Sequence, residues 1–122
     1  MNQTPNTPPP SKDDIYRQLE RVLGSPDFKA SSQQIAFLKF IVDQTLDSNA
    51  GLINDQTIAT QVFGRGPEFD LSVDPVVGIQ ASLLRRALER YYSTGGKNDP
   101  IRINIPNGTY VPMFHRQKLN RS

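Results

Sequence analysis

Apolar residues recur with helical spacing in the first part of the chain and predict two amphipathic helices. The first follows Ser11, a good N-cap, and ends at Gly24-Ser25-Pro26. The second begins after Ser31 or Ser32 and runs to about Asp47. The apolar positions are Ile15, Leu19, Val22 and Leu23 in the first helix, and Ile35, Phe37, Leu38, Ile41, Val42 and Leu46 in the second.

Two more helices are predicted, a short one over 54–63 and a long one over 76–92. Asn54 is placed to cap the short helix, and Asp74 to cap a helix that begins with Pro75. The stripe expected to pack inward in the long helix is Val77, Ala81, Leu84, Leu88 and Tyr91. The opposite face holds Ile79, Ser82, Leu83, Arg86 and Arg90, flanked by Arg85 and Glu89.

The residues after the long helix change to the alternating pattern of β-strands. Isoleucines at 101, 103 and 105 alternate with Arg102 and Asn104, so one face of this strand should be buried. Asn107-Gly108 suits positive φ in a tight turn over 106–109, and residues 110–114 would return. The sequence therefore predicts a β-hairpin over 101–114.

The order of these elements predicts a fold that is mostly α with a C-terminal β-hairpin. The short helix precedes the long one at a distance suited to a helix-turn-helix, and a hairpin that follows can form a wing. We therefore expect a winged helix-turn-helix with extra N-terminal helices. Residues 12–115 would form this winged-helix domain, between a disordered tail over 1–11 and a basic flexible tail over 116–122.

Charge is divided unevenly along the chain. Residues 1–84 carry six Lys/Arg against ten Asp/Glu, whereas residues 85–122 carry eight against two. The basic part coincides with the long helix and the hairpin, which favours a polyanionic partner. The alternative is a solvated basic tail, because three of these eight cations lie after the last predicted strand.

Catalytic and metal-binding chemistry finds no support in the sequence. There is no cysteine, and the single histidine, His115, has neither the partners of a metal site nor those of a Ser-His-Asp arrangement. Glu68, Asp70 and Asp74 are better read as capping or solvated carboxylates than as acid–base catalysts. We therefore expect that the protein is not an enzyme and has no cofactor, metal or small-molecule substrate. We also expect no membrane span and a cytoplasmic location.

From residue 54 to residue 114 the chain resembles the winged-helix effector domain of OmpR-type response regulators. It is also similar, from Ile15 to Phe114, to the N-terminal winged-helix module of bacterial adenylate-cyclase-like or TPR-repeat regulators. The motifs that carry the resemblance are Val62-Phe63-Gly64-Arg65, Asp74-Pro75-Val76-Val77, Leu84-Arg85-Arg86, Leu88-Glu89-Arg90-Tyr91-Tyr92, Asp99-Pro100-Ile101-Arg102-Ile103 and Ile105-Pro106-Asn107-Gly108-Thr109-Tyr110. The resemblance implies a DNA-binding fold.

One departure from the family's pattern concerns the face that would meet DNA. The family tends to place arginines at the positions of Gly78, Ser82 and Leu83, which here are small, neutral or apolar. Ile79 and Leu83 instead form an apolar pair one turn apart. This pair is either exposed, and then suited to a protein partner, or covered by the N-terminal helices.

The predicted function is DNA-binding transcription regulation, with double-stranded DNA as the partner. The candidate DNA contacts are Arg85, Arg86 and Arg90, the base-edge readers Gln80 and Ser82, and the wing residues Arg102, Asn107, Gly108 and Thr109. The alternative is a protein-interaction or oligomerisation module that uses Ile79 and Leu83. In that case the partner is a second copy, giving a homodimer, or another regulatory protein.

Overall fold

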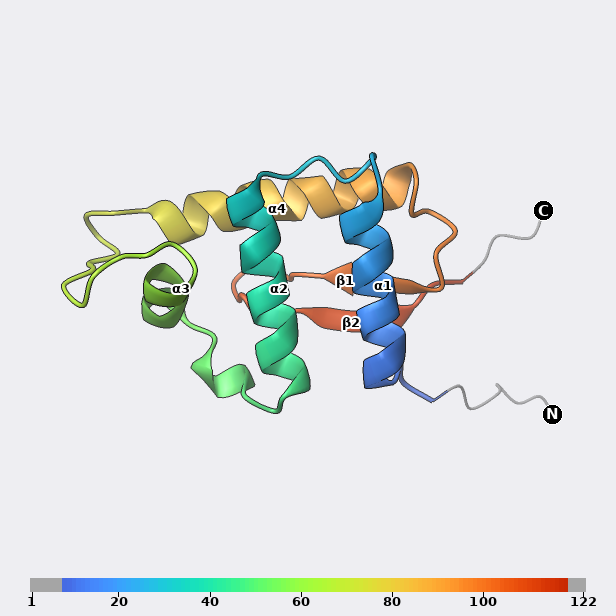
Figure 1. The fold of residues 1–122 in the computed structure, drawn as a ribbon, viewed down its shortest axis with the longest axis horizontal. Helices are drawn as coiled ribbons and strands as arrows, with labels where there is room; N and C mark the ends of the chain where they lie inside the picture. The colour runs from blue at the N-terminus through green and yellow to red at the C-terminus, as the bar shows by residue number, and fades with distance from the viewer. Residues whose placement is uncertain (1–7, 119–122) are drawn as a thin grey trace.

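The computed structural model of the protein describes residues 8–118. This part of the chain forms four α-helices and one two-stranded antiparallel sheet (Figure 1). The elements are α1 (Lys12–Gly24), α2 (Ser32–Leu46), the 3₁₀ turn η1 (Ala50–Leu52), α3 (Asp55–Gln61), α4 (Val76–Ser93), β1 (Ile101–Asn104) and β2 (Met113–Arg116). The predicted order of helices and C-terminal hairpin is confirmed. Residues 1–7 and 119–122 of the predicted tails lie outside the described residues.

Side-chain caps start the first three helices where the sequence predicts them. Ser11 and Ser31 each accept the backbone N–H three residues on, and Asp14 and Gln34 bond back to complete two capping boxes. Asn54 caps α3 by accepting the N–H of Thr57 at 2.9 Å. That helix ends two residues earlier than predicted, at Gln61.

The start of α4 differs from the prediction. Pro75 itself is the N-cap residue and makes no side-chain capping bond. Asp74, one position earlier, still accepts the N–H of Val76 at 3.2 Å, while its other carboxylate oxygen accepts the Nε–H of Arg65 at 2.7 Å. The carboxylate therefore braces the turn before α4 rather than capping the helix directly.

One apolar cluster joins α4 to the other helices and to β1. All five predicted stripe residues of α4 are buried, and so are Ala87 and Tyr92, which the stripe omitted. Phe37, Ile41, Ile58 and Phe63 belong to the same cluster. The rings of Phe37 and Phe63 meet edge to face with centroids 5.5 Å apart. The long helix is thus held rigidly along one side.

The hairpin has a longer connection and a different register from those predicted. Ile103 pairs with Phe114, which a tight turn over 106–109 alone would not place opposite it, because residues 105–112 form a loop instead of continuing the strands. Pro106 and Pro112 explain this, since neither has an N–H for a ladder hydrogen bond. Arg116, predicted to belong to the tail, is the last residue of β2.

Only half of the predicted turn geometry is present in this loop. The N–H of Thr109 bonds the carbonyl of Pro106 at 3.4 Å, and Gly108 has φ +87°. Asn107 does not have positive φ, so the pattern is that of a type II turn rather than the mirror-image turn of a two-residue hairpin. Ile105 before the turn is buried, as its alternation with Asn104 predicts.

The outer edge of β1 is covered by a side chain of α4. The hydroxyl of Tyr92 accepts the N–H of Ile103 at 2.9 Å and donates to the carbonyl of Ile101 at 3.2 Å. Gln18 of α1, which is fully buried, donates to the same hydroxyl at 3.2 Å and to Asp99 at 2.8 Å. This network fixes the sheet against α1 and α4.

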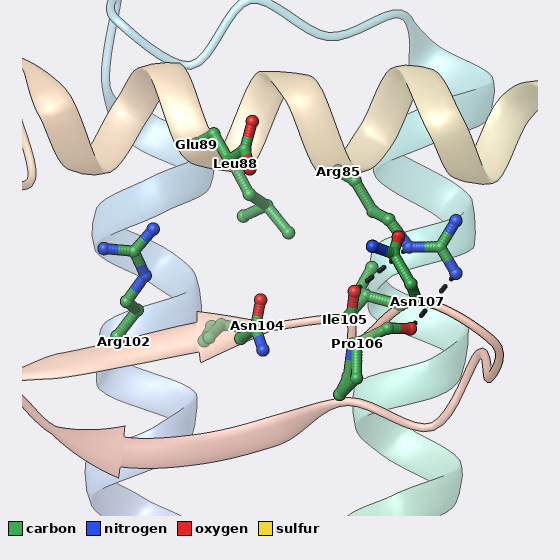
Figure 2. Close-up of a pocket in the computed structure, with 9 residues that line it drawn as sticks. Arg85, Leu88, Glu89, Arg102, Asn104, Ile105, Pro106 and Asn107 are labelled. Carbon is green, nitrogen blue, oxygen red and sulfur yellow. Dashed lines mark hydrogen bonds between the residues drawn. The ribbon is translucent and has the colours of Figure 1, made fainter.

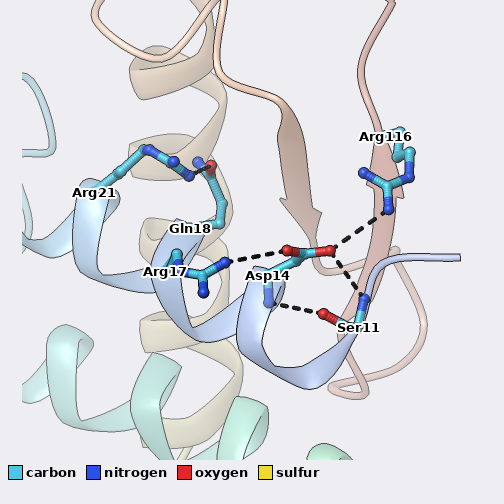
Figure 3. A network of polar contacts seen from close by, with 6 residues as sticks. All are labelled: Ser11, Asp14, Arg17, Gln18, Arg21 and Arg116. Atoms are coloured by element: carbon cyan, nitrogen blue, oxygen red, sulfur yellow. Dashed lines mark hydrogen bonds and ion pairs between the residues drawn. The ribbon is translucent and has the colours of Figure 1, made fainter.

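Asp14 ties the start of α1 to the end of β2 (Figure 3). Its carboxylate accepts the N–H of Ser11 at 3.3 Å and lies 3.4 Å from Arg17 and 3.5 Å from Arg116. The hydrogen bonds with Ser11 lower the pKa of Asp14 most, and the two guanidinium groups lower it further. The hairpin is therefore anchored at its far end as well.

Candidate nucleic-acid interface

The exposed face of α4 carries two of the arginines that are predicted to contact DNA. Arg86 and Arg90, one turn apart, are both exposed, and so is Ser82 one turn before them. Glu89 is exposed beside them and shares a shallow surface hollow with both arginines and with Ser93. The face can therefore offer two guanidinium groups to an anion, with one carboxylate opposing them.

The side chain of Arg85 points toward the hairpin loop (Figure 2). Its Nε–H donates to the carbonyl of Ile105 at 3.0 Å, and its Nη2 group donates to the carbonyls of Pro106 at 3.3 Å and Thr109 at 2.8 Å. A planar guanidinium suits such a set of acceptors better than a lysine would. Arg85 thus holds the loop against α4, a role different from the predicted DNA contact.

Gln80 points toward α2 rather than toward the loop. Its side-chain oxygen accepts the amide of Gln34 at 3.0 Å, and the residue is half-buried. The helix turns by about 100° per residue, so Gln80 and Arg86 project in different directions. Gln80, one of the two predicted base-edge readers, is therefore separated from the exposed arginines and from the loop.

The loop also contacts α3, through a hydrogen bond that the sequence does not predict. The hydroxyl of Tyr110 donates to the carboxylate of Asp55, in the first turn of α3, at 2.9 Å. Burial raises the pKa of Tyr110 most, and Asp55 raises it further. Asn107 and Gly108 remain exposed at the loop tip, while Thr109 accepts the N–H of Val111 at 3.1 Å. No local sequence pattern links positions 55 and 110.

Arg102 is half-buried and rests on an aromatic ring. Its guanidinium carbon lies 4.9 Å from the centre of the Tyr92 ring. It lines a cavity of about 240 Å³ between α4 and β1, together with Arg85, Glu89, Asn104 and Asn107 (Figure 2). The predicted wing arginine therefore lies at the groove between helix and hairpin, not at the loop tip.

Ile79 and Leu83 are exposed, with 52% and 39% of their surfaces accessible. The alternative in which the N-terminal helices cover them is therefore wrong for residues 8–118. They lie on the same side of α4 as Arg86, because residues three and four apart are neighbours on a helix. The exposed face is thus apolar in its first half and basic in its second.

Two of the three carboxylates considered for chemistry, Asp70 and Asp74, are engaged in local structure, and Glu68 is exposed. Asp70 accepts the N–H and the hydroxyl of Ser72 at 3.0 and 2.7 Å, and these bonds lower its pKa. Arg65 lowers the pKa of Asp74 most. Within residues 8–118 no three His, Cys, Asp or Glu side chains gather as a metal site. In the same range, no helix combines the length and the apolar composition needed to cross a membrane.

The chain matches no family model, no curated protein and no solved structure. A functional assignment therefore depends on the residues themselves and on their geometry. The features that carry most weight are the exposed face of α4 and the loop 105–112 held beside it.

Proposed function

We propose that this domain is a winged helix-turn-helix that binds double-stranded DNA and regulates transcription without catalysing a reaction. In this proposal α3 and α4 are the helix-turn-helix pair, α4 enters the major groove, and the loop 105–112 with its two strands is the wing. The observation that carries it is the pair of exposed guanidinium groups, Arg86 and Arg90, on a helix whose neighbouring loop is fixed in place by Arg85.

The nine predicted contacts divide into three groups by their surroundings. Arg86 and Arg90 are free to reach phosphates, and Ser82 a base edge, because all three are exposed on one side of α4. The loop-tip residues Asn107 and Gly108 suit a backbone or minor-groove contact, whereas Thr109 beside them and Arg102 in the groove are half-buried. Arg85 and Gln80 are proposed to hold the interface in shape, because their polar groups are bonded within the protein.

The number of available cations sets the expected strength of binding. The logarithm of the affinity falls with the logarithm of salt by about 0.9 per phosphate contacted, so two arginines give a slope of roughly −2. Glu89 lowers the affinity further, because its carboxylate lies beside both arginines. We expect weak binding that is easily measured only at low ionic strength.

Titration of a labelled duplex at several salt concentrations tests the proposal. Arg86→Ala and Arg90→Ala should each weaken binding and reduce the magnitude of the salt slope by about one. Glu89→Gln should strengthen binding. Arg17→Ala is the matched control, because it removes an exposed guanidinium from α1, away from the α4 face. Equal losses for Arg17→Ala and Arg86→Ala would overturn the assignment of α4 as the DNA-contacting helix.

A protein-interaction module is the second candidate, and the exposure of Ile79 and Leu83 favours it. Ile79→Ser and Leu83→Ser should leave salt-dependent DNA binding intact if the two side chains serve only a protein partner. If wild-type protein shows no affinity for any duplex at low salt, the DNA-binding proposal fails and the interaction module remains.

A further inference from the structure

Exposed apolar side chains are concentrated at one end of α4. Of the six large apolar residues that are exposed within residues 8–118, four lie between positions 71 and 83. They are Leu71, Val73, Ile79 and Leu83, and Val73 is the most exposed at 77%. A cluster of this kind marks a contact surface more often than single scattered residues do.

The exposed face of α4 has the spacing of a helix–helix contact. Ile79, Leu83, Arg86, Arg90 and Ser93 follow one another at steps of four, three, four and three residues, and all are exposed. These steps are those of a heptad seam, which places the side chains along one line of the helix. The seam has no partner within residues 8–118.

The two ends of this surface carry opposite charge. Before α4, Glu68 and Asp70 surround one surface hollow together with Val73. Arg65 and Asp74 line the same hollow and pair with each other at 2.7 Å, so the hollow keeps a net negative charge. At the other end the seam carries Arg86 and Arg90, which outnumber the single carboxylate of Glu89 beside them. The surface is therefore acidic, then apolar, then basic along the chain.

A surface with this order is complementary to itself when one copy is turned by 180°. A two-fold contact joins the same patch on both subunits, so residue i meets residue j and residue j meets residue i. With the axis between Ile79 and Leu83, the rise of about 1.5 Å per residue puts Arg90 about 13 Å from the axis, beyond the partner's helix start. That is where the segment bearing Asp70 joins α4.

We propose that a second copy of this chain docks on α4, through an antiparallel contact of the two α4 helices. Ile79 and Leu83 form its apolar centre, and Arg86 and Arg90 face Glu68 and Asp70 of the other copy. This inference does not depend on DNA binding. If both proposals hold, dimer and DNA compete, because Arg86 and Arg90 take part in both contacts.

The contact is small, and the dimer should dissociate on dilution. An 18-residue helix is ~27 Å long, and a single helix pair gives less surface than a stable interface of about 800 Å² per partner. The exchange between monomer and dimer should therefore be visible within the micromolar to millimolar range. Added salt should weaken it through the screened charge pairs.

Sedimentation equilibrium of residues 1–122 without DNA provides the first test. Wild type should show a reversible monomer–dimer equilibrium, and Leu83→Ser should weaken it at least tenfold. Leu52→Ser is the matched control, because Leu52 is also an exposed leucine, at 53% against 39% for Leu83, but lies on η1. A wild type that stays monomeric at ~1 mM overturns the proposal, and so does a dimer that Leu83→Ser leaves unchanged.

Charge reversal tests the antiparallel arrangement separately. Arg86→Glu with Arg90→Glu makes both ends of the surface acidic, and Glu68→Lys with Asp70→Lys makes both ends basic. Each double variant alone should stay monomeric, whereas an equimolar mixture should form a heterodimer. Circular dichroism checks that both remain folded. Homodimers of either variant as strong as the wild type, or a mixture that does not associate, would overturn the arrangement.

Discussion

Arg85 and Thr109 lie 24 residues apart in the chain, and the guanidinium of Arg85 donates to the carbonyl of Thr109 at 2.8 Å. The next residue, Arg86, projects about 100° away around the helix and is exposed. Two adjacent arginines, equivalent in the sequence pattern, therefore have different surroundings. One fastens the loop to the helix, and the other is available to a partner.

Removing the Arg85 side chain should release the loop. Arg85→Ala leaves three backbone carbonyls without their donor, so the backbone resonances of residues 105–109 should shift and broaden in NMR spectra. If the loop is a wing, DNA affinity should fall while the salt slope stays within about half a unit of wild type, unlike the change for Arg86→Ala. Unchanged resonances of residues 105–109 would contradict this role.

Two leucines of α4 should respond oppositely to truncation. Leu88 is 3% exposed and lies in the core, so Leu88→Ala should lower the free energy of unfolding by roughly 2–5 kcal/mol. Leu83 is 39% exposed, so Leu83→Ala should change it by less than about 0.5 kcal/mol in dilute solution. Urea denaturation measures both, and similar values for the pair would contradict the orientation of the helix.

Two glycines should also respond oppositely to alanine. Gly78 lies in α4 with no atom within 4 Å of an added Cβ, so Gly78→Ala should stabilise the protein by about 0.5–1 kcal/mol. Gly108 is equally open but has φ +87°, so Gly108→Ala should destabilise it by about 1 kcal/mol. The sign of the two shifts in melting temperature is the result to check.

All four tyrosines should resist ionisation in the folded protein. Burial raises the pKa of Tyr16, Tyr91, Tyr92 and Tyr110 above the ordinary value of 10.0, and Asp99 adds to the effect at Tyr91. The unfolded chain therefore loses its tyrosine protons at a lower pH than the folded protein does. The free energy of unfolding keeps its full value below pH 10 and falls as the pH rises above it. Tyrosinate absorbance should therefore appear together with loss of circular dichroism. Substantial ionisation in a still folded protein at pH 10 would contradict these surroundings.

Features that depend on neighbouring residues could be predicted from the sequence. The caps at Ser11, Ser31 and Asn54 and the buried stripe of α4 follow from local spacing, and the structure contains them. The alternation from Ile101 to Ile105 likewise gave the buried face of β1. Exposure of Ile79 could not be decided, because it depends on where distant helices pack.

Features set by distant contacts could not be predicted in the same way. Asn107-Gly108 indicates a turn, but the sequence does not show how far the loop continues, so the pairing of Ile103 with Phe114 could not be predicted. The bonds of Arg85 to the loop could not be predicted, because its three acceptors are backbone carbonyls, which no sequence pattern displays.

The hydrogen bond between Gln18 and Asp99 has a consequence for folding during synthesis. The two residues are 81 positions apart, and α1 packs against β1. During synthesis from the N-terminus, α1 therefore leaves the ribosome long before its partner strand exists. Its apolar positions, Ile15, Leu19 and Val22, can contact α2 early but are covered fully only after Ile101–Asn104 has been added. A chain stopped before β1 would leave part of the surface of α1 uncovered, so we expect such truncated chains to aggregate more readily than complete ones.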